Sequence, residues 1–329
     1  MSTFQISQDK VQKLAAALNQ IVIGCEPQIE TICCALLARG HVSALGEPGT
    51  AKTLTMKGIA WIFDGSAKYH REQLVSDTMP ADLLGANVFV KELSKFKYRF
   101  GPLNPKTNFF HADEINRTTP KTQSALLQAM EENAISLPTG VRNLHDVFMV
   151  LATRNPIDLE GTYPLPAAQL DRFAAEIVYD RLNEAEELDV VDKTTSASSR
   201  HGIDASLRGI LQLSDIPEMR EAMRTVHCSR EVKQYAVKLG YATRPGVLKE
   251  LDKYFLAGVS VRAAQWLVLL AQARAFFHGR DYVKPDDVKA LAKPVLRHRL
   301  YLTQEKLLRN VKPDDVIQQI VDLVPIVKS

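Results

Sequence analysis

Eight consecutive residues in the first sixth of the chain have the pattern of a loop that binds phosphate. They are Gly46, Glu47, Pro48, Gly49, Thr50, Ala51, Lys52 and Thr53, which match G-x-x-x-x-G-K-[ST] except that Ala51 replaces the last glycine. Successive backbone N–H groups that lead into a helix form a concave anion site, which the helix dipole strengthens. We expect Lys52 to reach the β- and γ-phosphates and the Thr53 hydroxyl to take a place on Mg²⁺.

An acidic pair follows an apolar run further along the chain. Residues 108–112 are Asn-Phe-Phe-His-Ala, and Asp113 and Glu114 come next. Ligands of open α/β sheets bind outside the carboxyl ends of the strands, so the pair is expected opposite the phosphate loop. Asp113 would hold Mg²⁺ mostly through water, and Glu114 would polarise the attacking water as a general base. A solvated helix start is the alternative for an acidic pair taken alone.

A mainly parallel sheet is the element that would position these groups. Short apolar runs predict strands at residues 41–45, 108–112, 148–153 and 173–179. Helical patterns separate or precede them, at residues 8–19, 27–39 and 121–132, and another helix should begin near Lys52. Apolar strands that alternate with helices indicate an α/β fold whose sheet is covered on both faces.

Two insertions and a second domain complete the predicted organisation. Residues 87–98 and 135–147 have strand-like residues on both sides of turn chemistry and are expected to form hairpins that protrude from the sheet. From residue 183 onward the pattern predicts only helices, interrupted by a polar connection at residues 194–202. Its clearest helix begins at the cap Ser260. The expected domains are therefore residues 1–182 and 183–329.

Composition is that of an ordinary globular protein. The chain has 329 residues, with 46% hydrophobic and 24% charged, which excludes a disordered or collagen-like chain. The net charge, 41 − 38 = +3, is too balanced to predict binding to nucleic acid or to a membrane surface. Charged residues interrupt the N-terminal stretch, and no apolar run is long enough to span a bilayer, so a cytoplasmic protein without a membrane segment is expected. The four cysteines lack CxxC spacing and are interpreted as buried apolar residues.

Together with other segments, these motifs resemble the MoxR family of AAA+ ATPases. The segments that carry the resemblance are the loop from Gly46, Ala-Asp-Glu-Ile-Asn-Arg from residue 112, Pro-Lys-Thr-Gln-Ser-Ala-Leu-Leu-Gln-Ala-Met-Glu-Glu from residue 120, Ala-Thr-Arg-Asn-Pro-Ile from residue 152, Glu-Gly-Thr-Tyr-Pro-Leu-Pro from residue 160 and Gln-Leu-Asp-Arg-Phe from residue 169. Ala51 is itself typical of this family. The resemblance implies a P-loop AAA+ core with a mainly parallel sheet and β-hairpin insertions, followed by a smaller all-α lid domain.

The resemblance also assigns roles to single residues. Asn155 resembles the sensor-1 residue that orients the attacking water, and Arg172 stands where the family carries its arginine finger, which acts on the nucleotide of a neighbouring subunit. Arg262 resembles sensor 2, which contacts phosphate from the lid of the same subunit. Ile23 and Gly24 match the stretch that packs on adenine. Purely structural roles remain open for three of these residues: a turn at Asn155, a surface ion pair at Arg172 and a capping or surface role for Arg262.

The family implies an activity and partners. It implies Mg²⁺-dependent hydrolysis of ATP to ADP and phosphate by a homo-oligomer, a hexameric ring. It further implies chaperone-like remodelling, maturation or metal-cofactor insertion in a client complex, with a von Willebrand factor A domain protein as adaptor. In place of the Glu-Ala found in many relatives the chain has Ala167-Ala168, which puts an acidic contact near the subunit boundary in doubt.

Three alternatives belong to other classes. A nucleic-acid motor would use the inserted hairpins, where Lys91, Lys95, Lys97 and Arg99 form either a basic contact surface or a solvated face. The near-neutral net charge argues against this motor. A magnesium-chelatase-type ATPase subunit is disfavoured by the sequence of the phosphate loop. A non-hydrolysing nucleotide-binding scaffold is the least favoured, because the residues expected to catalyse hydrolysis are all present.

Overall fold

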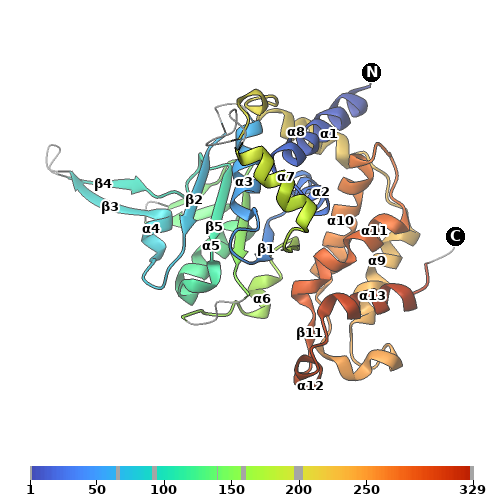
Figure 1. Cartoon of the computed structure of the whole chain (residues 1–329). Coiled ribbons are helices and arrows are strands. Elements are labelled where there is room, and N and C mark those ends of the chain that lie inside the picture. Colours follow the sequence, from blue (N-terminus) through green and yellow to red (C-terminus); the bar gives the residue numbers. More distant parts are fainter. Residues whose placement is uncertain are drawn as a thin grey trace.

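A five-stranded parallel sheet forms the centre of the molecule (Figure 1). The computed structural model describes residues 2–63, 67–90, 95–138, 140–156, 161–195 and 203–326. The order of the strands is β2-β5-β8-β1-β9, and each neighbouring pair is parallel. The strands are β1 (Val42–Gly46), β2 (Tyr69–Gln73), β5 (Phe109–Asp113), β8 (Met149–Arg154) and β9 (Ala175–Tyr179). The predicted α/β fold is confirmed.

Helices cover both faces of this sheet, and successive side chains of a strand enter different cores. Phe109 and Met149 join the larger core with the helices α1, α2 and α3, whereas Phe110 and Val150 join a smaller core with α5. The helices on the two faces are α1 (Thr3–Ile21), α2 (Glu26–Leu37), α3 (Lys52–Ile62), α4 (Pro80–Leu84), α5 (Pro120–Glu132) and α6 (Ala167–Leu170). Burial explains why four of the five strands, β1, β5, β8 and β9, were predictable as apolar runs.

Strand β2 was not predicted, because its sequence is polar. It reads Tyr-His-Arg-Glu-Gln and lies at the edge of the sheet beside β5. An edge strand needs no apolar run on both faces, so no apolar pattern marks it. Its register with β5 places Arg71 opposite His111 and Gln73 opposite Asp113.

Both expected insertions are antiparallel hairpins. The first pairs β3 (Gly85–Val90) with β4 (Lys95–Phe100) and projects away from the sheet (Figure 1). The second pairs β6 (Ala134–Leu137) with β7 (Gly140–Asn143) and is shorter than predicted, because residues 144–148 lead into β8. Lys91 lies outside the described residues.

Helices follow β9, but the expectation of helices alone is wrong. A short antiparallel ribbon joins β10 (Phe255–Ala257) to β11 (Tyr301–Leu302). The strands are too short to give a sequence pattern of their own. The helices are α7 (Glu184–Thr195), α8 (Asp215–Arg224), α9 (Arg230–Ala242), α10 (Val261–Phe277), α11 (Pro285–Leu296), α12 (Gln304–Leu308) and α13 (Pro313–Leu323). Of the predicted polar connection, residues 194–195 end α7, and residues 196–202 lie outside the described residues.

The C-terminal helices share a core with the first two helices. Helix α8 packs on α1, and α10 packs on α2. Apolar residues from both ends of the chain form one cluster, which includes Leu14 and Ile32 together with Met219 and Leu270. The proposed boundary between residues 182 and 183 lies between β9 and α7, in a segment outside this cluster. All four cysteines are free and buried. None of the described helices is long and apolar enough to cross a membrane.

A buried arginine joins α8 to the end of α2. The guanidinium of Arg220 donates hydrogen bonds to the Leu36 carbonyl, at 3.2 and 3.0 Å, and to the Asp146 carbonyl at 2.9 Å. Carbonyl groups in the last turn of a helix lack intrahelical partners, so Arg220 supplies one. Burial lowers the pKa of Arg220 to about 10, well above neutral pH, so the group stays charged.

We expect Arg220→Ala to reduce the free energy of unfolding by about 2–4 kcal/mol, because buried carbonyl groups lose charged donors. Urea denaturation would measure the change. The control is Arg224→Ala on the same helix, whose side chain is 56% exposed and pairs with an exposed Glu221; it should change the free energy by less than about 0.5 kcal/mol. Equal effects of the two substitutions would contradict this account of Arg220.

Candidate nucleotide site

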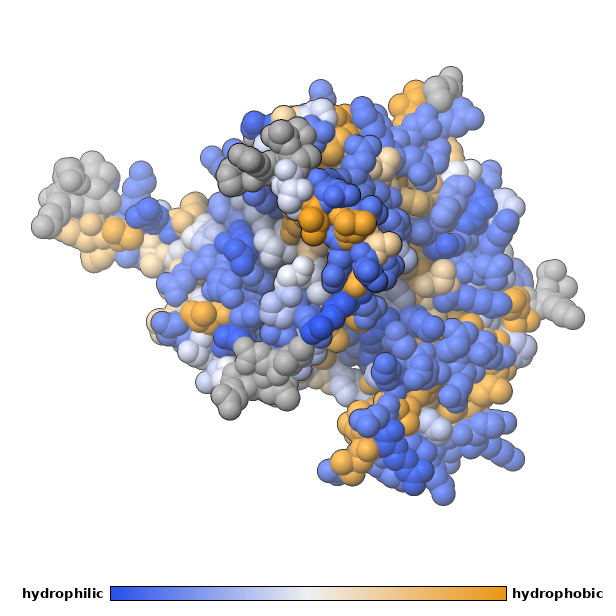
Figure 2. Space-filling view, in the orientation of Figure 1, coloured by the Kyte–Doolittle hydropathy of each residue, from blue (hydrophilic) through white to orange (hydrophobic). Residues whose placement is uncertain are grey.

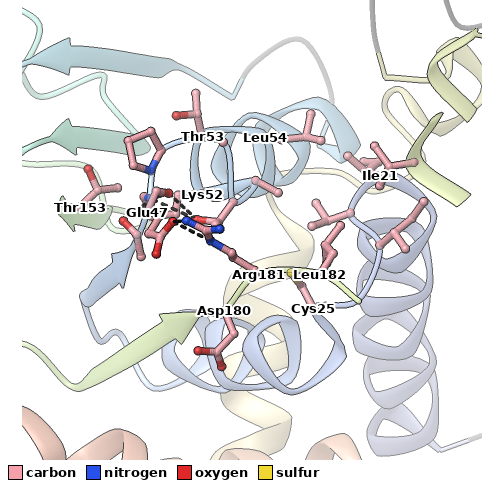
Figure 3. Close-up of a pocket in the computed structure, with 18 of the residues that line it drawn as sticks. Ile21, Cys25, Glu47, Lys52, Thr53, Leu54, Thr153, Asp180, Arg181 and Leu182 are labelled. Carbon is pink, nitrogen blue, oxygen red and sulfur yellow. Dashed lines mark hydrogen bonds and ion pairs between the residues drawn. The ribbon is translucent and has the colours of Figure 1, made fainter. Parts of the chain in front are cut away.

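A cavity of about 1410 Å³ opens at the carboxyl ends of β1, β5 and β8. Its walls contain the whole phosphate loop, and the acidic pair faces that loop from β5. Ile23 and Asn155, which were predicted from the sequence, also line it. Figure 3 shows Lys52 and Thr53 toward one end of this cavity and the apolar side chains of Ile21 and Leu182 toward the other. The cavity therefore has a polar end and an apolar end.

The phosphate loop joins β1 to α3 and holds its own lysine. Lys52 Nζ donates hydrogen bonds to the Gly46 carbonyl at 2.7 Å, the Glu47 carbonyl at 2.5 Å and Thr50 Oγ1 at 3.1 Å (Figure 3). Burial lowers the pKa of Lys52, although Asp113, Glu114 and Glu47 act in the opposite direction. The ammonium group thus lies over the loop carbonyls, within the same cavity as the acidic pair.

Two positions of the loop have unusual backbone requirements. A Cβ atom on Gly46 would lie 2.8 Å from the Tyr179 carbonyl oxygen, so the close approach of β1 and β9 requires glycine there. Ala51 has φ +63°, in the left-handed region, immediately before α3. A residue with a Cβ atom in this region costs about 1–2 kcal/mol. This conformation explains why a glycine stands at the corresponding position of the generic motif.

Asp113 is fixed from two neighbouring strands. Thr153 of β8 donates to Asp113 Oδ1 at 2.5 Å, and Arg71 of β2 donates to Asp113 Oδ2 at 3.1 and 2.6 Å. Burial acts to raise the pKa of Asp113, but the hydrogen bonds from Thr153 and Arg71 outweigh it and lower the pKa. Asp113 is therefore ionised at neutral pH.

Glu114 turns away from the strand in a left-handed conformation, with φ +56°. Its backbone N–H donates to Thr153 Oγ1 at 2.9 Å, so one hydroxyl group contacts both members of the acidic pair. Its carboxylate accepts a hydrogen bond from Gln73 at 3.1 Å and pairs with Arg117 at 2.9 Å. Both the backbone and the side chain of Glu114 are thus oriented by neighbouring residues.

Sequence reasoning missed Arg71, Gln73 and Thr153. The two residues of β2 carried no signal, because that strand was not recognised. Thr153 carried a signal that could have been used: it ends the apolar run at residues 148–153, and adjacent parallel strands end at the same edge of a sheet. The same reasoning places Asn155, which comes directly after β8 and lines the cavity.

The apolar end of the cavity is built around the segment between α1 and α2. Val22, Ile23 and Cys25 line it. Gly24 has φ +68°, and a Cβ atom on it would lie 2.8 Å from Leu182, so this turn requires glycine. Residues of α7 form a further wall. An apolar wall of this kind can accommodate an aromatic base.

Arg172 and Arg262 lie in a different place from the other predicted site residues. Among the described residues that line the first cavity, neither arginine is present; both line a second cavity of about 760 Å³. Arg172 Nε is 2.8 Å from Glu131 Oε2, and Arg262 pairs with Glu131 Oε1. Arg262 therefore lines a different cavity from the one that contains the phosphate loop, whereas the sequence analysis expected it beside the phosphates of its own subunit. The start of α10 lines this second cavity, and α10 itself packs on α2.

Comparisons with known proteins agree with this architecture. The family described as "ATPase family associated with various cellular activities (AAA)" matches residues 41–175, and the AAA lid domain matches residues 252–320. The chain is 35% identical to the uncharacterized protein YeaC of Bacillus subtilis over 95% of this chain and 94% of the relative. It is 33% identical to Chaperone MoxR1 of Mycobacterium tuberculosis over 93% of this chain and 80% of the relative.

A solved structure gives the same result. The crystal structure of a candidate ATPase from Cytophaga hutchinsonii superposes with a TM-score of 0.89 at 33% identity, and covers 99% of this chain and 97% of the other. The resemblance found in the motifs thus extends over nearly the full chain. Fold, lid and relatives lead to one conclusion: the chain belongs to the MoxR family of AAA+ ATPases.

Proposed function

We propose that this protein hydrolyses ATP with Mg²⁺ and uses the energy to remodel a partner protein complex. One observation carries the proposal: Lys52 and the pair Asp113 and Glu114 line the same cavity, at the carboxyl ends of parallel strands. This is the arrangement that a triphosphate and its metal require. The apolar end around Ile23 would take the base.

The residues present fit Mg²⁺. Mg²⁺ prefers oxygen ligands and is held by one or two carboxylates together with phosphate oxygens and water. Ionised Asp113 and the Thr53 hydroxyl are such donors, and both line the cavity. The described residues contain no group of three or more His, Cys, Asp or Glu suited to a resident metal. When bound, the ion would neutralise phosphate charge.

Each polar residue then has a distinct task. Lys52 exchanges the loop carbonyls for the β- and γ-phosphates, while the backbone of residues 46–53 surrounds the anion. Glu114, oriented through Thr153 and Gln73, takes a proton from the attacking water. Asn155 orients that water beside the γ-phosphate.

The two arginines act across a subunit boundary. Both line a cavity other than the one that contains the phosphate loop of their own chain, which supports a common role on the nucleotide of a neighbour. Arg172 is the proposed arginine finger, and Arg262 acts beside it rather than within its own subunit. A site completed by a neighbour requires a homo-oligomer, for which the family suggests a hexameric ring.

The client and adaptor follow from the family. We propose a chaperone-like role in the maturation of, or metal-cofactor insertion into, a client complex in the cytoplasm, with a von Willebrand factor A domain protein as adaptor. The projecting hairpin is one candidate contact. Figure 2 shows apolar residues gathered on it, and Val88, Phe89, Phe96 and Phe100 are exposed.

We expect Glu114→Gln to reduce hydrolysis by about 10²–10⁴-fold and to leave Mg-ATP binding intact, because it removes the base but keeps the size of the side chain. Phosphate release and calorimetry would measure the two quantities. The control is Glu221→Gln, an exposed carboxylate on α8, which should change neither. Turnover close to that of the unmodified protein would refute the role of Glu114.

Arg172→Ala should reduce turnover by about 10³–10⁵-fold without loss of ATP binding. A mixture of Arg172→Ala and Glu114→Gln subunits should recover part of the turnover. In the mixture, the Arg172→Ala subunits supply Glu114 and the Glu114→Gln subunits supply Arg172. Arg309→Ala, which removes an exposed arginine of the C-terminal region, is the matched control. Failure of the mixture to recover activity would argue against a role across the boundary.

A nucleic-acid motor is favoured by one observation, the basic face of the first hairpin. Lys95, Lys97 and Arg99 alternate along β4 with Phe96, Tyr98 and Phe100. As a remodelling ATPase, the protein should hydrolyse ATP at the same rate with or without DNA at low salt. Stimulation by DNA that falls steeply with salt, and that is lost in Lys95→Glu/Lys97→Glu, would favour the motor instead. Steady-state ATPase assays decide between them.

A further inference from the structure

We propose that Glu131 is a positioning residue that holds Arg172 and Arg262 together, so that both guanidinium groups reach one triphosphate on a neighbouring subunit. Nothing in the motifs assigns a role to this carboxylate. The inference rests on the proposed action of the two arginines across the subunit boundary. It concerns how the two guanidinium groups are held at a fixed distance from each other.

One carboxylate serves both arginines. Glu131 lies in the last turn of α5, with Oε2 2.8 Å from Arg172 Nε and with Oε1 paired to Arg262 Nη2. Arg172 comes from the turn between α6 and β9, and Arg262 from the first turn of α10. Three elements that are distant in sequence therefore meet at a single side chain.

The charges explain why such a residue is needed. The cavity that contains the two arginines is also lined by Arg39 and Lys233, so arginine and lysine outnumber the carboxylates Glu131 and Asp171 among its described lining residues. Two guanidinium groups side by side repel each other, and their long side chains can separate into other rotamers. A carboxylate between them removes the repulsion and fixes both tips at once.

The partial exposure of the cluster indicates a role in geometry more than in stability. The side chains of Arg172, Glu131 and Arg262 are 26%, 37% and 40% exposed. Ion pairs in such surroundings contribute only about 0–1 kcal/mol to stability. Loss of Glu131 should therefore leave the fold intact and change the placement of the arginines.

A second set of contacts fixes the backbone on either side of the cluster. Asp171 accepts hydrogen bonds from buried Arg299 at 2.7 Å and from Ser260 at 2.8 Å, and Ser260 caps α10. The residue before Arg172 and the cap two residues before Arg262 are thus joined directly. The backbones are held by Asp171, and the tips of the arginines by Glu131.

We expect Glu131→Ala to reduce turnover by about 10–100-fold, as a displacement near 1 Å does, with ATP binding and thermal unfolding unchanged. Glu131→Gln keeps one acceptor oxygen, so its turnover should lie between that of the unmodified protein and that of Glu131→Ala. The matched control is Glu132→Ala, the next residue of α5, whose carboxylate bonds Gln128 of its own helix. Unchanged turnover in Glu131→Ala would overturn the proposal, as would turnover lost together with thermal stability.

A mixing experiment separates this proposal from the proposed function. Subunits with Glu131→Ala keep their own nucleotide site, and subunits with Glu114→Gln keep the arginine cluster, so the mixture should recover turnover. Recovery in the mixture of Arg172→Ala and Glu114→Gln, but not in this one, would overturn the role of Glu131 and leave the finger in place. Recovery in neither would overturn both. Combined with Arg172→Ala, the loss of Glu131 should reduce turnover by less than it does alone, because only Arg262 is then left to be positioned.

Discussion

The hydroxyl group of Thr153 holds the acidic pair in the orientation on which the site depends. It donates a hydrogen bond to the Asp113 carboxylate and accepts one from the backbone N–H of Glu114. One side chain therefore fixes both the Asp113 carboxylate and the backbone turn at Glu114. This contact exists because β5 and β8 are adjacent and in register, with Ala112 opposite Ala152. The geometry of the acidic pair is therefore set by the sheet, and only secondarily by the loop that follows β5.

The sequence was most informative where burial imposes a period. Strands β1, β5, β8 and β9 are largely buried and were predicted as apolar runs, and the phosphate loop was predicted from its glycines and lysine. Strand β2 was missed because an edge strand can be polar. Arg71 lies on this strand and was therefore missed as well, although it helps to keep Asp113 ionised. The ribbon of β10 and β11 was missed because two or three residues give no alternation to read.

Long-range placement was the part that the motifs could not supply. The sequence assigned Arg262 to the nucleotide of its own subunit, but the side of the subunit on which it lies depends on how α10 packs against α2. That packing is set by apolar contacts between residues more than two hundred positions apart, for which one sequence has no local pattern. Glu131 was overlooked for the same reason, since its link to the two arginines is visible only in the contacts that it makes.

The shared apolar cluster also limits how the protein can move. Because α1 and α2 are buried against α8 and α10, a wide hinge opening between sheet and C-terminal helices would expose part of a continuous core. Such exposure is costly, so the shared cluster opposes a hinge between these two parts of the chain. We therefore expect the sheet and the C-terminal helices of one chain to move as a single rigid body.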